Sequence, residues 1–168
     1  MSFKKFGVIL LIFILLQTTS CGTSRVSALD LFEEVNKTVS FDNCTMYTYI
    51  PDADNETRNL LLSRIYSDGS LLPPEISLCD DYLIVLHNGN EIMELHIFRA
   101  VSAYDAPKLE DMLVARRDRM QNGEIYDYVD ESSSERIASA MIITEGRFVI
   151  LSVTDKNETI YDIAKRIS

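Results

Sequence analysis

The chain lacks the short motifs that usually reveal an enzyme. Its 168 residues contain no glycine-rich phosphate loop and no Gly-x-Ser-x-Gly nucleophile elbow, and no motif pairs a cysteine with a histidine. Only two histidines occur, His87 and His96, and neither belongs to a metal-ligand spacing. The sequence therefore predicts no catalytic, metal-binding or cofactor-binding residue, and it favours a protein that is not an enzyme.

Cysteine is scarce, with single residues at Cys21, Cys44 and Cys79. In an oxidising compartment, Cys44 and Cys79 could close a loop of about 35 residues with a disulfide. The alternative is two buried thiols that pack as small apolar groups. The sequence slightly favours the thiols, because one pair is not a disulfide framework in a domain of this size.

Basic residues are too few to balance the acidic ones. There are 16 Lys and Arg residues against 26 Asp and Glu residues, which gives a net charge of −10. Removal of residues 1–20 would take away Lys4 and Lys5 and no acidic residue, so the charge would become −12. An acidic surface repels phosphate backbones and anionic lipid headgroups, which argues against nucleic-acid partners and against electrostatic docking on a membrane.

One long apolar run is present, at residues 6–16, and it directly follows Lys4 and Lys5. A membrane-spanning helix needs about 20 apolar residues, and this run ends earlier. A short apolar run after positive charges is typical of an export signal, so residues 1–20 are predicted to be a signal peptide.

The residues around Cys21 indicate how the mature chain is held. Ser20, Cys21 and Gly22 fit a lipoprotein cleavage site, at which the thiol is lipidated and becomes the new N-terminus. Two or more acyl chains would anchor the protein stably on the extracytoplasmic face of the cell membrane. The alternative is ordinary cleavage near Ser20 and secretion; Thr18 supports it, because lipoprotein signals usually carry leucine at that position.

After a short tether at residues 21–26, residues 27–168 have the length of a single domain. Apolar periodicity and turn residues predict helices near 27–39, 61–66, 105–122, 132–139 and 157–167, and two β-hairpins built from strands at 82–87, 92–100, 141–145 and 148–154. Because each hairpin is followed by a helix, the predicted fold is α+β. It has a four-stranded antiparallel sheet with helices on one face, and the N-terminal helices also pack on the sheet.

Two candidate metal sites fail on spacing. Residues 52–56 begin like a calcium loop, but Thr57 and Ser63 stand where such a loop needs glycine and glutamate. In the first hairpin, His87 is expected to pair with Glu91 and His96 with Tyr82, so the two imidazoles point to opposite faces and cannot share one metal ion.

Two further clusters each allow two interpretations. Arg116, Arg117 and Arg119 could bind an anion, but positive charges at the end of a helix are favoured by its dipole, and this is the preferred explanation. Tyr126 and Tyr128, with Tyr104, could line a groove for a glycan or peptide. The preferred explanation is that they pin a long connection onto the sheet.

The C-terminal half resembles a known but uncharacterised family. The likeness lies in residues 94–100 (ELHIFRA), the charged helix after them, the region of Tyr128 and the hairpin at residues 141–151 (MIITEGRFVIL). From Glu91 onward, the chain is similar to small Gram-positive bacterial lipoproteins with a domain of unknown function. The resemblance implies a lipoprotein signal and therefore supports lipidation of Cys21, but it assigns no functional residue.

These observations favour an envelope-tethered, non-enzymatic domain that binds a protein, a peptide or a wall glycan. A sensor domain that modulates a neighbouring membrane protein is not distinguished from it. The alternative is a small hydrolase of envelope polymers that uses a carboxylate pair, although no pair can be chosen among 26 acidic residues.

Overall fold

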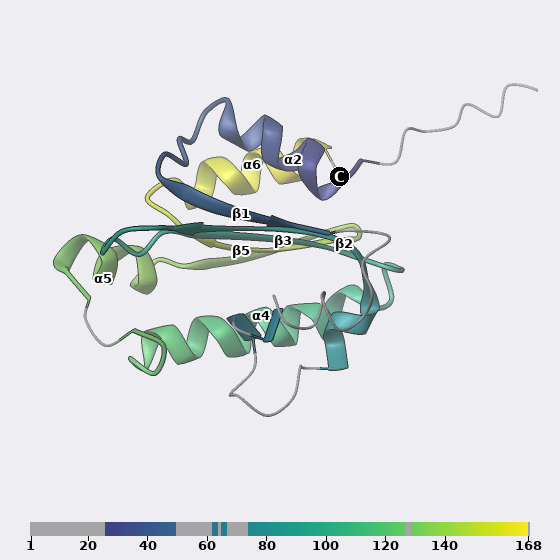
Figure 1. Ribbon diagram of the computed structural model, residues 1–168. Helices are drawn as coiled ribbons and strands as arrows, with labels where there is room; N and C mark the ends of the chain where they lie inside the picture. The colour runs from purple at the N-terminus through teal and green to yellow at the C-terminus, as the bar shows by residue number, and fades with distance from the viewer. Residues whose placement is uncertain (1–25, 50–61, 64, 67–73, 127–128, 168) are drawn as a thin grey trace, which may run out of the picture.

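The computed structural model describes residues 26–49, 62–63, 65–66, 74–126 and 129–167. They form an antiparallel sheet between two layers of helices (Figure 1). The strands are β1 (Cys44–Thr48), β2 (Cys79–His87), β3 (Glu94–Ala100), β4 (Met141–Glu145) and β5 (Phe148–Val153). The helices are α2 (Ala28–Asn36), α4 (Ala106–Gln121), α5 (Glu131–Ala138) and α6 (Asn157–Ile167), with a 3-10 helix η1 (Pro74–Leu78).

The α+β class and both hairpins agree with the prediction, but the sheet has five strands and not four. Its order is β1-β2-β3-β5-β4, so β3 and β5 join the two hairpins at the centre. The missed strand, β1, has only five residues and lies at the edge, where Met46 pairs with Val85 of β2. Its short sequence, CTMYT, carries no strong alternation of apolar and polar residues.

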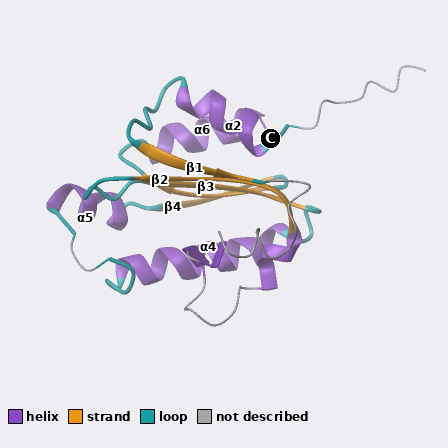
Figure 2. Ribbon diagram, in the orientation of Figure 1, coloured by secondary structure: helices purple, strands orange, loops and turns teal. Residues whose placement is uncertain are grey.

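Helices cover both faces of the sheet, so the prediction of one covered face is wrong (Figure 2). On one face, side chains such as Leu83, Leu95 and Ile150 pack against α2 and α6. On the other face, Ile84, Phe98 and Leu151 pack against α4. Successive residues of a strand point to opposite faces, so β5, which is covered on both sides, is buried at every position.

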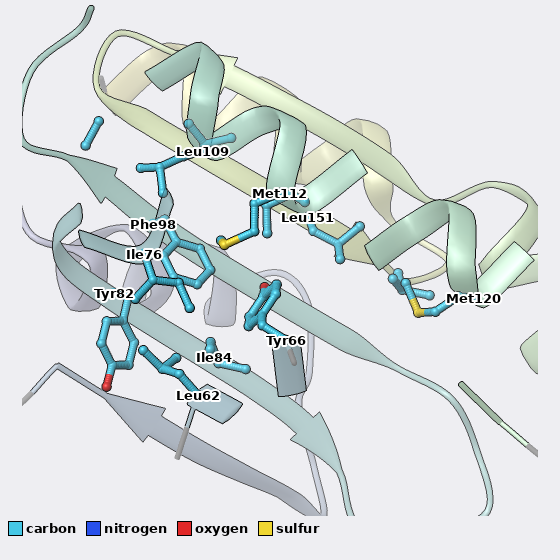
Figure 3. Close-up of a cluster of buried hydrophobic side chains, with 14 of the residues drawn as sticks. Leu62, Tyr66, Ile76, Tyr82, Ile84, Phe98, Leu109, Met112, Met120 and Leu151 are labelled. Carbon is cyan, nitrogen blue, oxygen red and sulfur yellow. The ribbon is translucent and has the colours of Figure 1, made fainter. Parts of the chain in front are cut away.

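Figure 3 shows the core on the α4 face. Leu109, Met112 and Met120 of α4 lie over the sheet, and Leu62 and Tyr66 from the chain before η1 enter the same core. The helical spacing of Leu109, Met112, Leu113 and Met120 predicts that these four residues form the buried face of α4, and all four are buried. The short helical stretches at residues 62–63 and 65–66 agree with the helix predicted in that region.

The sequence also predicts helix caps at Ser27, Asp105 and Ser132, and two of these three predictions need correction. The capping box of α2 is present as predicted, because Asp30 N donates to Ser27 Oγ (3.0 Å) and Ser27 N donates to Asp30 Oδ2 (2.8 Å). Asp105 precedes α4, but its carboxylate accepts from Ser102 Oγ (2.6 Å) and bonds no helix N–H. Helix α5 is capped by Asp130, which accepts from Ser133 N (2.7 Å), and not by Ser132.

Different segments of the chain meet at the two ends of the sheet, which are called the tether end and the far end. The tether end contains the start of β2, the end of β3 and the segment that leads into α2, because Arg99 Nη1 donates to the carbonyl of Val26 (2.7 Å). The far end contains the β2–β3 turn, the loop before β1 and the β5–α6 turn (Figure 1). A strand as long as β2 separates them by roughly 30 Å.

Several predictions concern residues outside the described part of the chain. These are the signal peptide at 1–20, nearly all of the tether, the rejected calcium loop at 52–56, and Tyr128. Within the described ranges, no helix combines the length and the apolar character needed to cross a bilayer.

Candidate functional site

Two hollows flank the β2–β3 turn at the far end. The larger, of about 410 Å³, lies between the loop before β1, α5 and the β5–α6 turn and is called the outer hollow. The smaller, of about 200 Å³, extends from the same turn to Tyr126 and is called the inner hollow. His87, Glu91 and Met93 line both. The far end is therefore hollowed on both sides of one turn.

The outer hollow presents both signs of charge. Its acidic groups are Asp42, Glu91 and Asp155, and its basic groups are Arg136 and Lys156. Arg136 Nη1 lies 3.2 Å from Glu91 Oε2, which leaves the other carboxylates and Lys156 to face a ligand. A surface of this kind suits a ligand that itself carries both an amine and a carboxylate.

His87 lies in the wall between the two hollows. Gly89 N donates to His87 Nδ1 (3.1 Å), and this bond holds the imidazole against the turn. A Cβ added at Gly89 would lie 2.8 Å from Cε1 of His87, closer than atoms normally approach. The position of the imidazole therefore requires glycine at residue 89.

Beneath the inner hollow lies a cluster of five polar side chains, called here the buried cluster: Tyr66, Glu94, His96, Arg116 and Tyr126. Arg116 donates to Glu94 twice, from Nη2 to Oε1 (2.8 Å) and from Nε to Oε2 (3.0 Å). The Tyr126 hydroxyl donates to the same Oε1. Arg116 also donates from Nη1 to the carbonyl of Ile65 (2.5 Å). The cluster joins β3, α4 and two connecting segments.

His96 is completely buried in this cluster. Its Nδ1 is hydrogen-bonded to the Tyr66 hydroxyl, and the two rings meet edge to face with centroids 5.6 Å apart. Its Nε2 lies 2.8 Å from Glu94 Oε2. Among the buried side-chain nitrogen and oxygen atoms of the described residues, it alone has no hydrogen-bond partner.

The charges in the buried cluster are held constant around neutral pH. Burial by itself raises the pKa of Glu94, but the charge of Arg116 and the contact with His96 hold that pKa far below its usual range. Burial lowers the pKa of His96, despite the nearby carboxylate. Burial, followed by the charge of Glu94, raises the pKa of Tyr126. Glu94 is thus ionised around neutral pH, whereas a general acid needs a raised pKa.

The three arginines of α4 do not share an anion site. Arg116 is buried and bonds Glu94, so its explanation as a charge at the end of a helix is wrong. Arg117 Nη2 lies 2.9 Å from Asp118 Oδ1, and Arg119 Nε lies 3.4 Å from Glu124 Oε2. Each guanidinium has a carboxylate of its own.

Tyr126 and Tyr104 lie in different environments, one partly buried and the other exposed. The Tyr126 hydroxyl bonds Glu94 below the inner hollow, which is the pinning role preferred for it. Tyr104 is 81% exposed, and Lys108 Nζ lies 5.5 Å from the centre of its ring. It lies before α4 at the tether end and does not belong to the far-end hollows.

The histidines lie on opposite faces as predicted, but the register differs. His96 pairs with Ile84, and Tyr82 pairs with Phe98. A shift of two residues preserves the face, which is why the faces were predicted correctly. No group of three or more His, Cys, Asp or Glu residues in the described ranges could hold a metal ion.

No disulfide joins Cys44 and Cys79 in the structure. Cys44 pairs with His87 at the far end of β2, whereas Cys79 begins β2 at the tether end. The strand between them holds the two residues roughly 26 Å apart, beyond the reach of any disulfide.

No protein-family model, curated protein or solved structure matches this chain. The resemblance to Gram-positive lipoproteins thus stays a prediction.

Sequence inspection missed both the far-end hollows and the buried cluster. The outer hollow draws its lining from four segments between residues 38 and 156. The local signal for the cluster was the presence of Glu94 and His96 among the apolar residues Leu95, Ile97 and Phe98. Polar residues at inward positions of a buried strand need partners, but their spacing does not say which ones.

Proposed function

We propose that this protein is a lipid-anchored, non-enzymatic binding domain on the extracytoplasmic face of the cell membrane. A lipid on Cys21 would hold it there, and the far end would bind a polar peptide segment of another envelope component. The observation that carries the proposal is the position of the hollows, at the end of the sheet opposite the start of the domain.

The beginning of the domain is bound firmly to the tether end. Arg99 Nη1 donates to the Val26 carbonyl, and Ala28 N donates to Asp81 Oδ2, both at 2.7 Å. A chain that reaches the membrane through Cys21 therefore approaches it from this end. The far-end hollows would then point away from the membrane, toward other envelope components.

The charges of the outer hollow favour a peptide over a neutral glycan. Asp42 and Asp155 offer carboxylates to an amine, and Lys156 offers an ammonium to a carboxylate. A peptide presents both groups, whereas a neutral sugar would leave these charges uncompensated. Val39 and Met93 add apolar contact area in the same hollow.

Hydrogen bonds between segments hold the far end in place. Asn88 N donates to the Asn43 carbonyl (2.9 Å), which joins the β2–β3 turn to the loop before β1. Ile92 N donates to Ser133 Oγ (2.8 Å), which joins the same turn to α5. A preorganised surface loses little conformational entropy when it binds, which favours recognition.

The test is photo-cross-linking in intact cells. A photoreactive residue at Ser40, in the outer hollow, should give a discrete adduct that contains a peptide, whereas the same residue at exposed Asp118 on α4 should not. Lys156→Glu should abolish the adduct. Lys165→Glu makes the same charge change on α6 outside the hollow and should leave the adduct intact. Equal labelling from both positions, or an adduct with glycan only, would contradict the proposed ligand.

The alternative, a hydrolase of envelope polymers, would draw its carboxylates from the same hollow. If it is correct, purified wall fragments should be cleaved by the wild-type protein, and Asp155→Asn or Asp42→Asn should abolish that cleavage. Cleavage that requires either carboxylate would replace the binding proposal with the enzymatic one.

A further inference from the structure

Large apolar side chains on the surface gather at the tether end. Four large apolar residues are exposed in the described part of the chain: Leu29 (45%), Met46 (45%), Val101 (51%) and Tyr104 (81%). Met46 lies in the middle of edge strand β1. The other three belong to segments that meet at the tether end.

The contacts of these segments establish their common position. Leu29 follows Ala28, whose N–H bonds Asp81 at the start of β2. Val101 follows the last residue of β3, and its N–H donates to the Leu78 carbonyl (2.8 Å). Tyr104 lies in the loop between β3 and α4. Figure 1 shows the starts of α2 and α4 at the same end of the sheet, in the layers above and below it.

Four of the charged groups at this end compensate one another, and two further carboxylates, Asp30 and Asp105, accept hydrogen bonds from the hydroxyls of Ser27 and Ser102. Asp80 bonds Arg99 (Oδ1 to Nε, 2.8 Å) and Arg147 (Oδ2 to Nη2, 2.7 Å). Asp81 Oδ2 lies 3.8 Å from Arg99 Nη1. Two aspartates and two arginines thus cancel, although the chain as a whole is strongly acidic. Repulsion from anionic headgroups is weakest where such charges are paired.

A lipid on Cys21 would keep the tether end close to the bilayer. Val26 is the fifth residue after Cys21. Five residues span at most about 18 Å even when fully extended, which is shorter than the sheet itself. The tether end is therefore the part of the described domain that such an anchor brings to the membrane surface.

We propose that the tether end is a membrane-contacting surface, on which Leu29, Val101 and Tyr104 enter the headgroup layer of the bilayer that carries the lipid. This inference rests on the proposed lipid anchor. Tyrosine favours that layer because its ring is apolar and its hydroxyl is polar. Lys108, beside the Tyr104 ring, can extend its ammonium to a lipid phosphate. The contact would hold the domain upright and keep the far end outward.

The absence of tryptophan from the chain permits a direct test. Tyr104→Trp introduces a single fluorophore at the proposed contact, and Met46→Trp introduces one at an exposed position in the middle of β1. Each full-length variant is expressed in its host, purified from membranes and reconstituted in phosphatidylglycerol–phosphatidylcholine vesicles, with or without brominated acyl chains. Mass spectrometry of the same samples reports whether Cys21 carries lipid.

The expected result is a blue-shifted emission for Tyr104→Trp that brominated lipids quench, and an emission for Met46→Trp that they leave unchanged. Adding Leu29→Ser and Val101→Ser to Tyr104→Trp should reduce the quenching, since the contact loses two of its apolar groups. Acylated protein with equal quenching at both positions would overturn the membrane contact and leave the anchor standing. Protein without acyl mass on Cys21 would overturn the anchor and the contact together.

Discussion

Arg116 bonds Glu94 through two parallel hydrogen bonds inside the protein, from Nη2 to Oε1 and from Nε to Oε2. The two residues are 1% and 7% exposed, Glu94 being the more buried, and they join the central strand β3 to helix α4. Each buried charge therefore depends on the other for its solvation. A pair of this kind specifies how the helix sits on the sheet.

Removal of one partner should be costly. Glu94→Ala leaves the Arg116 guanidinium buried without its anion, and we expect a loss of about 3–5 kcal/mol in the free energy of unfolding. Urea denaturation measures it. Asp118→Ala, which removes the exposed partner of Arg117, should cost less than about 1 kcal/mol. The double variant Glu94→Leu with Arg116→Leu should recover much of the lost stability, and a double variant less stable than the single one would contradict this account.

The buried cluster should make stability depend on pH in two separate windows. The pKa of His96 is lower in the folded chain than its ordinary 6.5, so the unfolded chain binds the proton more readily. Stability should then be constant above pH 6.5 and fall as the pH drops below it. In His96→Gln, urea midpoints measured between pH 7 and about pH 5 should vary much less than in the wild type. An equal slope in both proteins would exclude His96 as the cause.

Glu94 acts at lower pH. Its folded pKa lies below the ordinary 4.5, so the stability that it contributes is present above 4.5 and is lost as the pH falls further. Midpoints of Glu94→Gln should therefore be lower than those of the wild type at neutral pH. The difference should shrink on acidification below pH 4.5. A constant difference would show that the charge of Glu94 does not matter.

The bond between Ala28 N and Asp81 Oδ2 should protect the beginning of α2. In Asp81→Ala, the first turn of α2 loses this anchor to the sheet, and its amides should exchange with deuterium faster. Hydrogen-exchange mass spectrometry of peptides from residues 26–36 measures the change. Asp155→Ala, at the far end, is the control and should leave these peptides unaffected.

The internal cysteines should stay reduced even after export. Cys44 of β1 pairs with His87, the last residue of β2, whereas Cys79 is the first residue of β2. Folding therefore does not bring the two cysteines together. Intact mass under non-reducing conditions should show two thiols, each of which reacts with iodoacetamide after unfolding. A single intramolecular disulfide in native protein would require a different arrangement of β1 and β2.

Cys21→Ala tests the anchor. Without its thiol the chain accepts no diacylglycerol, so we expect the variant to appear in the medium or to remain as uncleaved precursor, whereas the wild type partitions with membranes. Fractionation followed by immunoblotting distinguishes these outcomes. Cys44→Ala is the matched control and should partition as the wild type does. If wild-type protein carries no acyl mass, the chain is secreted and not anchored.

Local patterns in the sequence were sufficient for several elements. Branched and aromatic residues on both sides of the Asn88-Gly89 turn predicted the first hairpin, and a turn at Gly146 between two such segments predicted strands β4 and β5. The Ser27–Asp30 capping box and the apolar stripe of α6 likewise depend on residues close together in the chain. Such features could be inferred because the interactions that create them span only a few positions.

Only the tertiary structure decided which surfaces meet. Apolar residues at successive positions of β5 are compatible with a strand covered on both faces, but they did not show that α2 and α6 cover one face and α4 the other. Arg116 had a local explanation in the helix dipole until the fold brought it to Glu94, 22 residues earlier. The outer hollow is lined by residues from four separate segments. Spacing along a chain specifies which face a side chain takes, whereas its partner depends on how distant elements pack.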